Sequence, residues 1–86
     1  MRAEYTLEAV AVCPADNKPD IYTVTVRATR TIPAEEILAV AESLKGKPMY
    51  QEAFTAEMHR ILAAEVETLG WHSGVRTRVI VGGGGW

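Results

Sequence analysis

The chain has 86 residues and a mass of 9.4 kDa, which allows one domain and excludes a second. Hydrophobic residues make up 48% of it and charged residues 23%, as in folded chains and unlike disordered ones. The net charge is −2 and no basic block occurs, which disfavours a protein that tracks nucleic-acid phosphates.

The cysteine content and the lack of a long apolar run indicate the cellular setting. One cysteine makes neither an internal disulfide nor a Cys-rich zinc site, as expected in a reducing compartment. Glu4 and Glu8 lie where a signal peptide would have its apolar core, and no apolar run reaches membrane-spanning length. We therefore expect a cytoplasmic protein with no membrane partner.

Two segments near the N-terminus alternate in the way of strands with one buried face. From Tyr5 to Val12, apolar residues at odd positions oppose Thr6 and Glu8. In residues 22–29, apolar residues at even positions oppose threonines and an arginine. Residues 13–20 contain two prolines and an Asp-Asn pair, which favour a turn, so the two strands are predicted to form a hairpin.

Two helices are predicted after this hairpin. The first begins at Pro33, carries an apolar stripe over residues 37–44 and ends before the Gly-Lys-Pro of residues 46–48. The second is predicted from Tyr50 to Leu69, because apolar residues recur there at helical spacing and Gly70 suits a C-cap.

An alternating segment from Val75 to Val81 predicts a last strand, so the element order is β-β-α-α-β. This order predicts an α+β domain over residues 1–81, in which an antiparallel sheet carries two helices on one face. Residues 82–86 are expected to form a glycine-rich tail. Such a sheet leaves strand edges open to pairing with another copy, so we expect a homo-oligomer.

Cys13 and Asp20 flank the predicted turn and are candidate catalytic residues. In a simple register they would face each other across the hairpin, where opposed Cα atoms lie about 4.5–5.5 Å apart. A cysteine nucleophile needs a partner that moves protons, and a carboxyl group meets that need. The alternative interpretation is that Cys13 merely ends a strand and Asp20 merely forms a turn.

Residues 12–24, VCPADNKPDIYTV, resemble the signature of the NADPH-dependent 7-cyano-7-deazaguanine reductase family. That family has Cys-Pro, four variable positions, Pro-Asp, two further positions and then Thr with a β-branched residue. It also has a Phe-His-Glu triplet at the start of its second helix, and this chain has Tyr50-Gln51-Glu52 there. The element order is similar to that of the tunnelling fold (T-fold), which the family shares with GTP cyclohydrolases and pterin synthases.

The resemblance implies a role for each of these residues. Cys13 would add to the nitrile carbon of 7-cyano-7-deazaguanine to form a covalent thioimide, and Asp20 would supply the proton. Glu52, with the neighbouring Gln51, would bind the purine-like ring, since a carboxylate accepts well from a ring N–H and an exocyclic amine. Without the cysteine motif, Glu52 would be interpreted as a first-turn acid that complements the helix dipole.

Three departures from the family distinguish this chain. Gln51 replaces the triplet histidine, and only Glu42-Ser43-Leu44-Lys45 is similar to the Glu/Ser/Lys-rich stretch associated with NADPH. The closing fourth strand of the fold is also expected to be missing. The archaeosine-forming amidinotransferases keep the Cys, Asp and Glu but lack the NADPH stretch, and they deliver ammonia to the same thioimide. We therefore expect no cofactor, with NADPH required only in a true reductase.

The expected partners are a deazapurine, free or within tRNA or DNA, and further copies of the chain. By analogy with T-fold relatives, the ligand site would lie at a subunit interface. A zinc site built from Cys13, His59 and His72 is disfavoured because their spacing matches no zinc signature. The alternative function is a deazapurine- or pterin-binding or structural T-fold protein that has lost turnover.

Overall fold

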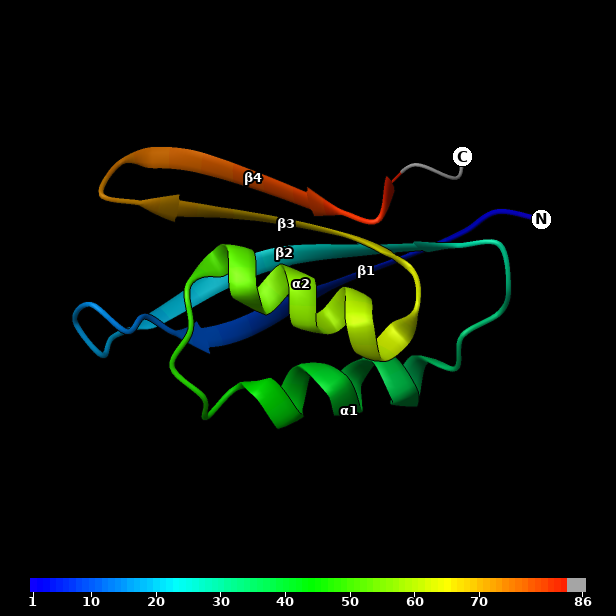
Figure 1. Cartoon of the computed structure of the whole chain (residues 1–86), viewed down its shortest axis with the longest axis horizontal. Coiled ribbons are helices and arrows are strands. Elements are labelled where there is room, and N and C mark those ends of the chain that lie inside the picture. Colours follow the sequence, from blue (N-terminus) through cyan, green and yellow to red (C-terminus); the bar gives the residue numbers. More distant parts are fainter. Residues whose placement is uncertain (84–86) are drawn as a thin grey trace.

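Within residues 1–83, which the computed structural model describes, four strands form one antiparallel sheet and two helices cover one of its faces (Figure 1). The predicted α+β class, with an antiparallel sheet and its helices on one face, is confirmed. The strands lie side by side in chain order, β1-β2-β3-β4. The elements are β1 (Ala3–Val12), β2 (Pro19–Ala28), α1 (Ala34–Leu44), α2 (Gln51–Leu62), β3 (Glu65–His72) and β4 (Val75–Val81).

The second helix is shorter than predicted, and the prediction of helix up to Leu69 was wrong. Helix α2 ends at Leu62 because Ala63 adopts a left-handed conformation (φ 51°), and its N–H donates to the carbonyl of His59 at 2.8 Å. Alanine seldom adopts that conformation, so no cap residue marks the helix end in the sequence. From Glu65 the residues alternate instead between the two faces of β3.

The closing strand of the fold, which was expected to be missing, is present. A two-residue turn, Ser73-Gly74, joins β3 to β4, and both residues have positive φ (51° and 83°). This is the backbone of a type I′ turn, which matches the twist of an antiparallel hairpin. His72 and Val75 are the last residues paired before the turn. The strand that was not expected is β3, and its residues 65–69 were predicted to be helical.

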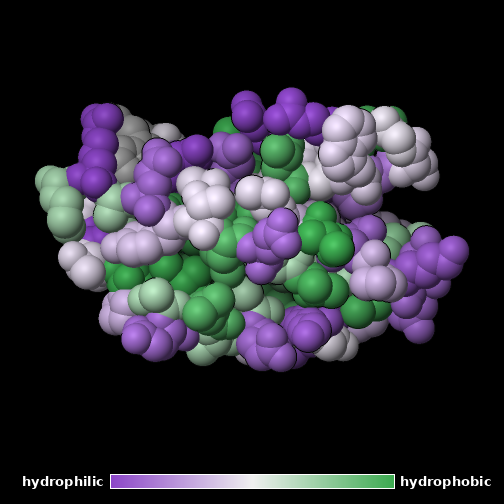
Figure 2. All heavy atoms as spheres, turned by 180° about the vertical axis from the view of Figure 1, so that it is seen from behind, coloured by the Kyte–Doolittle hydropathy of each residue, from purple (hydrophilic) through white to green (hydrophobic). Residues whose placement is uncertain are grey.

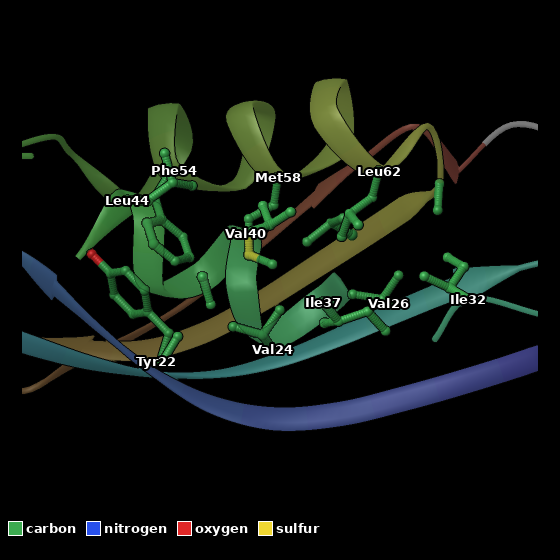
Figure 3. Close-up of a cluster of buried hydrophobic side chains, with 14 of the residues drawn as sticks. Tyr22, Val24, Val26, Ile32, Ile37, Val40, Leu44, Phe54, Met58 and Leu62 are labelled. Carbon is green, nitrogen blue, oxygen red and sulfur yellow. The ribbon is translucent and has the colours of Figure 1, made fainter. Parts of the chain in front are cut away.

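The core lies between the helices and the covered face of the sheet (Figure 3). Tyr22 of β2 and Phe54 of α2 pack against each other there, with ring centroids 5.4 Å apart. Three buried polar residues, Gln51, Thr55 and Thr68, bond to one another beside this apolar cluster. Burial of the apolar side chains supplies the main stabilisation, and the polar group specifies how α2 lies on the sheet.

The uncovered face of the sheet carries an ionic cluster centred on Arg27. Its guanidinium contacts the carboxylates of Glu4, Glu65 and Glu67 at 3.2, 2.7 and 2.9 Å, and these partners hold the pKa of Arg27 above its usual value. Arg78 pairs with Glu67 at 3.2 Å. Arg27 of β2 and Arg78 of β4 are therefore engaged in ion pairs across the sheet.

No helix in the described part of the chain is long and apolar enough to cross a membrane. The predicted glycine-rich tail begins at Gly82, and its last three residues lie outside the described residues.

Gly70 does not cap a helix as predicted; it lies in β3 against the ring of Tyr22. A Cβ atom at this position would lie 2.7 Å from Cδ1 of Tyr22, so the ring has to move if Gly70 gains a side chain. We predict that Gly70→Ala lowers the free energy of unfolding by about 1–3 kcal/mol, as overpacking does. Urea denaturation measures this, with Gly46→Ala as the control because nothing lies within 4 Å of its Cβ position. Equal stabilities of the two variants would contradict the prediction.

Candidate functional site

Three connections meet at one end of the molecule, away from the N-terminus (Figure 1): the β1–β2 turn, the α1–α2 loop and the β3–β4 turn. The N–H of Met49 donates to the carbonyl of Val12 at 3.1 Å, which holds the loop before α2 against the end of β1. The start of α2 is held in turn to the end of β3, because His72 bonds to Gln51. This end therefore gathers the residues singled out from the sequence.

The register of the first hairpin differs from the one expected. The N–H of Cys13 donates to the carbonyl of Lys18 at 3.0 Å, and Ala11 is the residue opposite Asp20. The turn is tighter than assumed because Asn17 has a positive φ of 61° and Asp16 accepts from the N–H of Lys18. The prediction that Cys13 and Asp20 are directly opposed was therefore wrong.

Cys13 and Asp20 nevertheless lie on the same face of the hairpin. Asp20 shares a face with Ala11, and Cys13 is two residues beyond Ala11, so the two are diagonal neighbours. That face is the one that the helices cover, because Tyr22 follows on it and is buried. Cys13 is a free, half-buried thiol.

The hydroxyl group of Tyr22 lies at the centre of the candidate site, and Figure 3 shows its oxygen pointing beyond the end of the apolar cluster. It donates to Oδ2 of Asp20 at 3.5 Å. Burial raises the pKa of Tyr22 well above its usual value, and the negative charges of Asp20, Cys13 and Glu52 raise it further. These three groups, from β2, the end of β1 and α2, therefore lie within electrostatic reach of one hydroxyl in a single chain.

The side chain of Gln51 is buried, with 2% of the residue exposed, and its amide is fully hydrogen-bonded within the chain. Its Nε2 donates to the carbonyl of Thr68 at 3.2 Å, to the hydroxyl of Thr68 at 3.1 Å and to the carbonyl of Thr77 at 3.0 Å. Its Oε1 lies 2.6 Å from Nε2 of His72. Gln51 thus joins the start of α2 to both strands of the second hairpin.

Tyr22 and His72 were not identified as site residues from the sequence. Nδ1 of His72 lies 3.8 Å from Oδ2 of Asp20, and the His72 ring lies 6.2 Å from that of Tyr22. The signals were present but weak: Tyr22 follows Asp20 by two residues in an alternating strand, and His72 precedes a Ser-Gly turn. Without the β3–β4 hairpin, nothing in the sequence placed His72 beside Asp20.

The structure does not bring together the three residues of the zinc alternative. His59 lies near the C-terminal end of α2, where its Nδ1 bonds to the carbonyl of Ala64 at 2.7 Å. His72 bonds instead to Gln51, the first residue of the same helix. Among residues 1–83 no group of three or more His, Cys, Asp or Glu residues is arranged to hold a metal ion.

Three hollows in the described surface lie away from Cys13. One lies at the opposite end of the sheet and is lined by Arg27, Arg30 and His59 among others. Another lies between β1 and α1 and includes Leu7 and Leu38, and the third follows the same edge. None of these three hollows is lined by Cys13.

The raised pKa of Tyr22 predicts a loss of stability in alkali. Above about pH 10 the unfolded chain releases the Tyr22 proton while the folded chain keeps it, so the unfolded state is favoured. The free energy of unfolding should then fall by up to about 1.4 kcal/mol per pH unit. Urea denaturation between pH 8 and 11 measures this, and Tyr22→Phe should lose less stability over this range than the wild type. The exposed Tyr50→Phe variant is the control; if it and Tyr22→Phe show the same alkaline loss, the assignment to Tyr22 is wrong.

No family model matches the chain, and no curated protein matches it. Among solved structures it is similar to the crystal structure of the archaeosine synthase QueF-like in its apo form. The TM-score is 0.86, and the match covers 93% of this chain and 90% of the other, at 17% sequence identity. At this identity the likeness shows a common fold: the chain has a T-fold-like α+β architecture.

Proposed function

We propose that the chain is an enzyme that processes the nitrile of 7-cyano-7-deazaguanine, free or within tRNA or DNA, through a covalent thioimide on Cys13. The observation that carries the proposal is that a half-buried thiol and two carboxylates lie within electrostatic reach of the Tyr22 hydroxyl, which donates to one of these carboxylates, Asp20. The Cys-Pro and Pro-Asp motif supplies the same thiol and one of these carboxylates. The T-fold-like architecture is compatible with this chemistry but is not specific to it.

The proposed step is the addition of the Cys13 thiol across the nitrile. The sulfur forms a bond to the nitrile carbon, one C–N π bond breaks, and the nitrogen takes up a proton from Asp20. The thiol gives up its own proton, so the addition needs no oxidant or reductant. Asp20 suits this role because it lies diagonally across the hairpin from Cys13 on the same face.

Glu52 is proposed to bind the deazapurine ring. It is exposed in the first turn of α2, where its carboxylate is free to accept from a ring N–H and an exocyclic amine. The amide of Gln51 is hydrogen-bonded to the sheet and to His72. We therefore assign Gln51 to the substrate site as the residue that holds His72 and the neighbouring Glu52 in position.

The second reactant is proposed to be ammonia and not the hydride of NADPH. The residues that are similar to the NADPH stretch, 42–45, lie at the end of α1, where Leu44 is buried in the core and the Ser43 hydroxyl bonds to the carbonyl of Val40. The similar solved structure is that of an archaeosine synthase. We therefore expect no cofactor in this protein.

A non-catalytic deazapurine-binding protein is the second candidate. The position of the hollows favours it, since none of the three borders Cys13. The same observation is compatible with an active site that a neighbouring copy completes. Adduct formation separates catalysis from binding alone.

The proposal predicts that the wild-type protein forms a thioimide when incubated with 7-cyano-7-deazaguanine. Mass spectrometry should detect a covalent adduct, and near-ultraviolet absorbance should report its formation rate. Cys13→Ala should form no adduct, and Asp20→Asn should form it at least about 100-fold more slowly, because general acid catalysis contributes on that order. Adding ammonia to the preformed adduct should release the enzyme.

The outcomes distinguish the candidates. Release by NADPH and not by ammonia would establish a reductase, and a stable adduct that neither reagent releases would leave a protein without turnover. Reversible binding with no covalent adduct would support the non-catalytic candidate. Asp16→Asn is the matched control for Asp20→Asn, because Asp16 is an exposed carboxylate in the same turn.

We also propose that the chain assembles with copies of itself and that the assembly completes the site. In the described chain the outer edges of β1 and β4 have no neighbouring strand, so β1 of one copy can pair with β4 of the next. Figure 2 shows apolar side chains gathered over the middle and lower part of one side of the molecule. The hollow between β1 and α1 is apolar as well, with Leu38 57% exposed beside it.

Assembly predicts a mass above 9.4 kDa in solution. Light scattering should show an oligomer at high concentration that dissociates on dilution, and Leu38→Lys should shift it towards the monomer. Ala39→Lys places the same charge at the neighbouring exposed position and is the control. A wild-type monomer that still forms the adduct would contradict the shared site.

A further inference from the structure

The orientation of the Gln51 amide is determined by its partners. Its nitrogen lies 3.2 and 3.0 Å from the backbone carbonyls of Thr68 and Thr77, and a carbonyl only accepts. The NH₂ group must therefore face the sheet, and the amide oxygen must face His72. Because an amide oxygen only accepts, Nε2 of His72 has to be the donor in their 2.6 Å contact.

This contact selects one tautomer of the imidazole. With its proton on Nε2, a neutral His72 has a lone pair on Nδ1, and Nδ1 lies 3.8 Å from Oδ2 of Asp20. The separation of 3.8 Å is that of an ion pair and not of a hydrogen bond, and two groups at this distance interact favourably when the pair holds one proton in addition to the one on Nε2. That proton is carried either by Nδ1 of an imidazolium or by the carboxyl group of Asp20.

The Tyr22 hydroxyl does not compete for this role. It donates to Oδ2 of Asp20, and its raised pKa keeps it protonated at neutral pH. The other titratable groups that act on this hydroxyl are Cys13, at the end of β1, and Glu52, in α2. Among the groups around Asp20, His72 therefore has the basic atom that can exchange a proton with it.

We propose that His72 and Asp20 share one proton, and that His72 is the positioning residue that supplies Asp20 with the proton for the substrate. The inference rests on the proposed function and adds a residue to its site. In the addition step, the shared proton moves from Asp20 to the nitrile nitrogen as the Cys13 sulfur bonds to carbon. The proton released by the Cys13 thiol then passes to the His72–Asp20 pair, which therefore holds one shared proton both before and after the addition.

The same geometry assigns a role to Gln51. By accepting from Nε2 it holds the second imidazole nitrogen towards Asp20, as an orienting group does for a catalytic histidine. The amide lies at the position of the family's triplet histidine. In this chain an imidazole reaches the site from β3 instead, where His72 ends the strand.

Nitrogen-15 NMR of the two histidines tests the proton sharing without any substrate. In the neutral imidazole of His72, Nε2 should carry the proton and Nδ1 should be the unprotonated nitrogen. Gln51→Met removes the acceptor and should give a mixture of tautomers. A neutral His72 with its proton on Nδ1 would overturn the inference.

Adduct formation tests the role in chemistry. His72→Gln keeps a donor that can reach Gln51 but carries no exchangeable ring proton, so adduct formation should slow at least about tenfold. The pH profile of the rate should lose one ionisation, while the affinity for 7-cyano-7-deazaguanine changes less than about threefold. His59→Gln, at the other end of α2, is the matched control.

The failures of the two proposals are distinguishable. If the wild type forms no adduct, the proposed function fails, and NMR still decides whether the proton is shared. If the wild type forms the adduct and a folded His72→Gln variant keeps its rate and pH profile, the role of His72 is refuted. Circular dichroism of each variant establishes that it is folded.

Discussion

The buried amide of Gln51 is the interaction on which the candidate site depends. Its nitrogen is bonded to Thr68 of β3 and Thr77 of β4, and its oxygen to His72, so the first residue of α2 is tied to both strands of the second hairpin. Leaving such a buried amide unpaired costs about 1–3 kcal/mol, so the start of α2 has a strongly preferred position on the sheet. That position brings Glu52 to the same end of the molecule as Cys13 and Asp20.

Packing and hydrogen bonding support this arrangement from opposite sides of Gln51. On one side Thr55 bonds to the Gln51 carbonyl at 2.7 Å and to the Thr68 hydroxyl at 2.6 Å. On the other side Tyr22 extends from the apolar core to Asp20, and the missing side chain of Gly70 leaves room for its ring. The site therefore lies at the boundary between the apolar core and a network of hydrogen-bonded polar groups. Cys13 and Asp20 are only partly buried there.

The ion pairs that stabilise the sheet lie apart from the charged groups of the candidate site. The guanidinium of Arg27 and its carboxylate partners occupy the uncovered face of the sheet. Cys13 and Asp20 lie on the covered face at one end, where Nδ1 of His72 lies 3.8 Å from Oδ2 of Asp20. The His72 imidazole is therefore the group with which Asp20 exchanges a proton in the proposed chemistry.

The sequence by itself determined the two strands of the first hairpin, the first helix and the α+β class, because alternation, prolines and helical spacing are local signals, but it did not determine the register of that hairpin. It also singled out Cys13, Asp20 and Glu52 as candidates, through a compact motif and a first-turn acid, and the structure places all three at one end of the molecule. Only the tertiary structure decided that residues 65–72 form a strand: the left-handed Ala63 that ends α2 has no sequence signature, and strand pairing with β2 outweighs helix spacing. The role inferred for His72 also depends on the tertiary structure. The pairing of β3 with β2 places His72 beside Asp20, and this pairing joins residues that are far apart in the sequence.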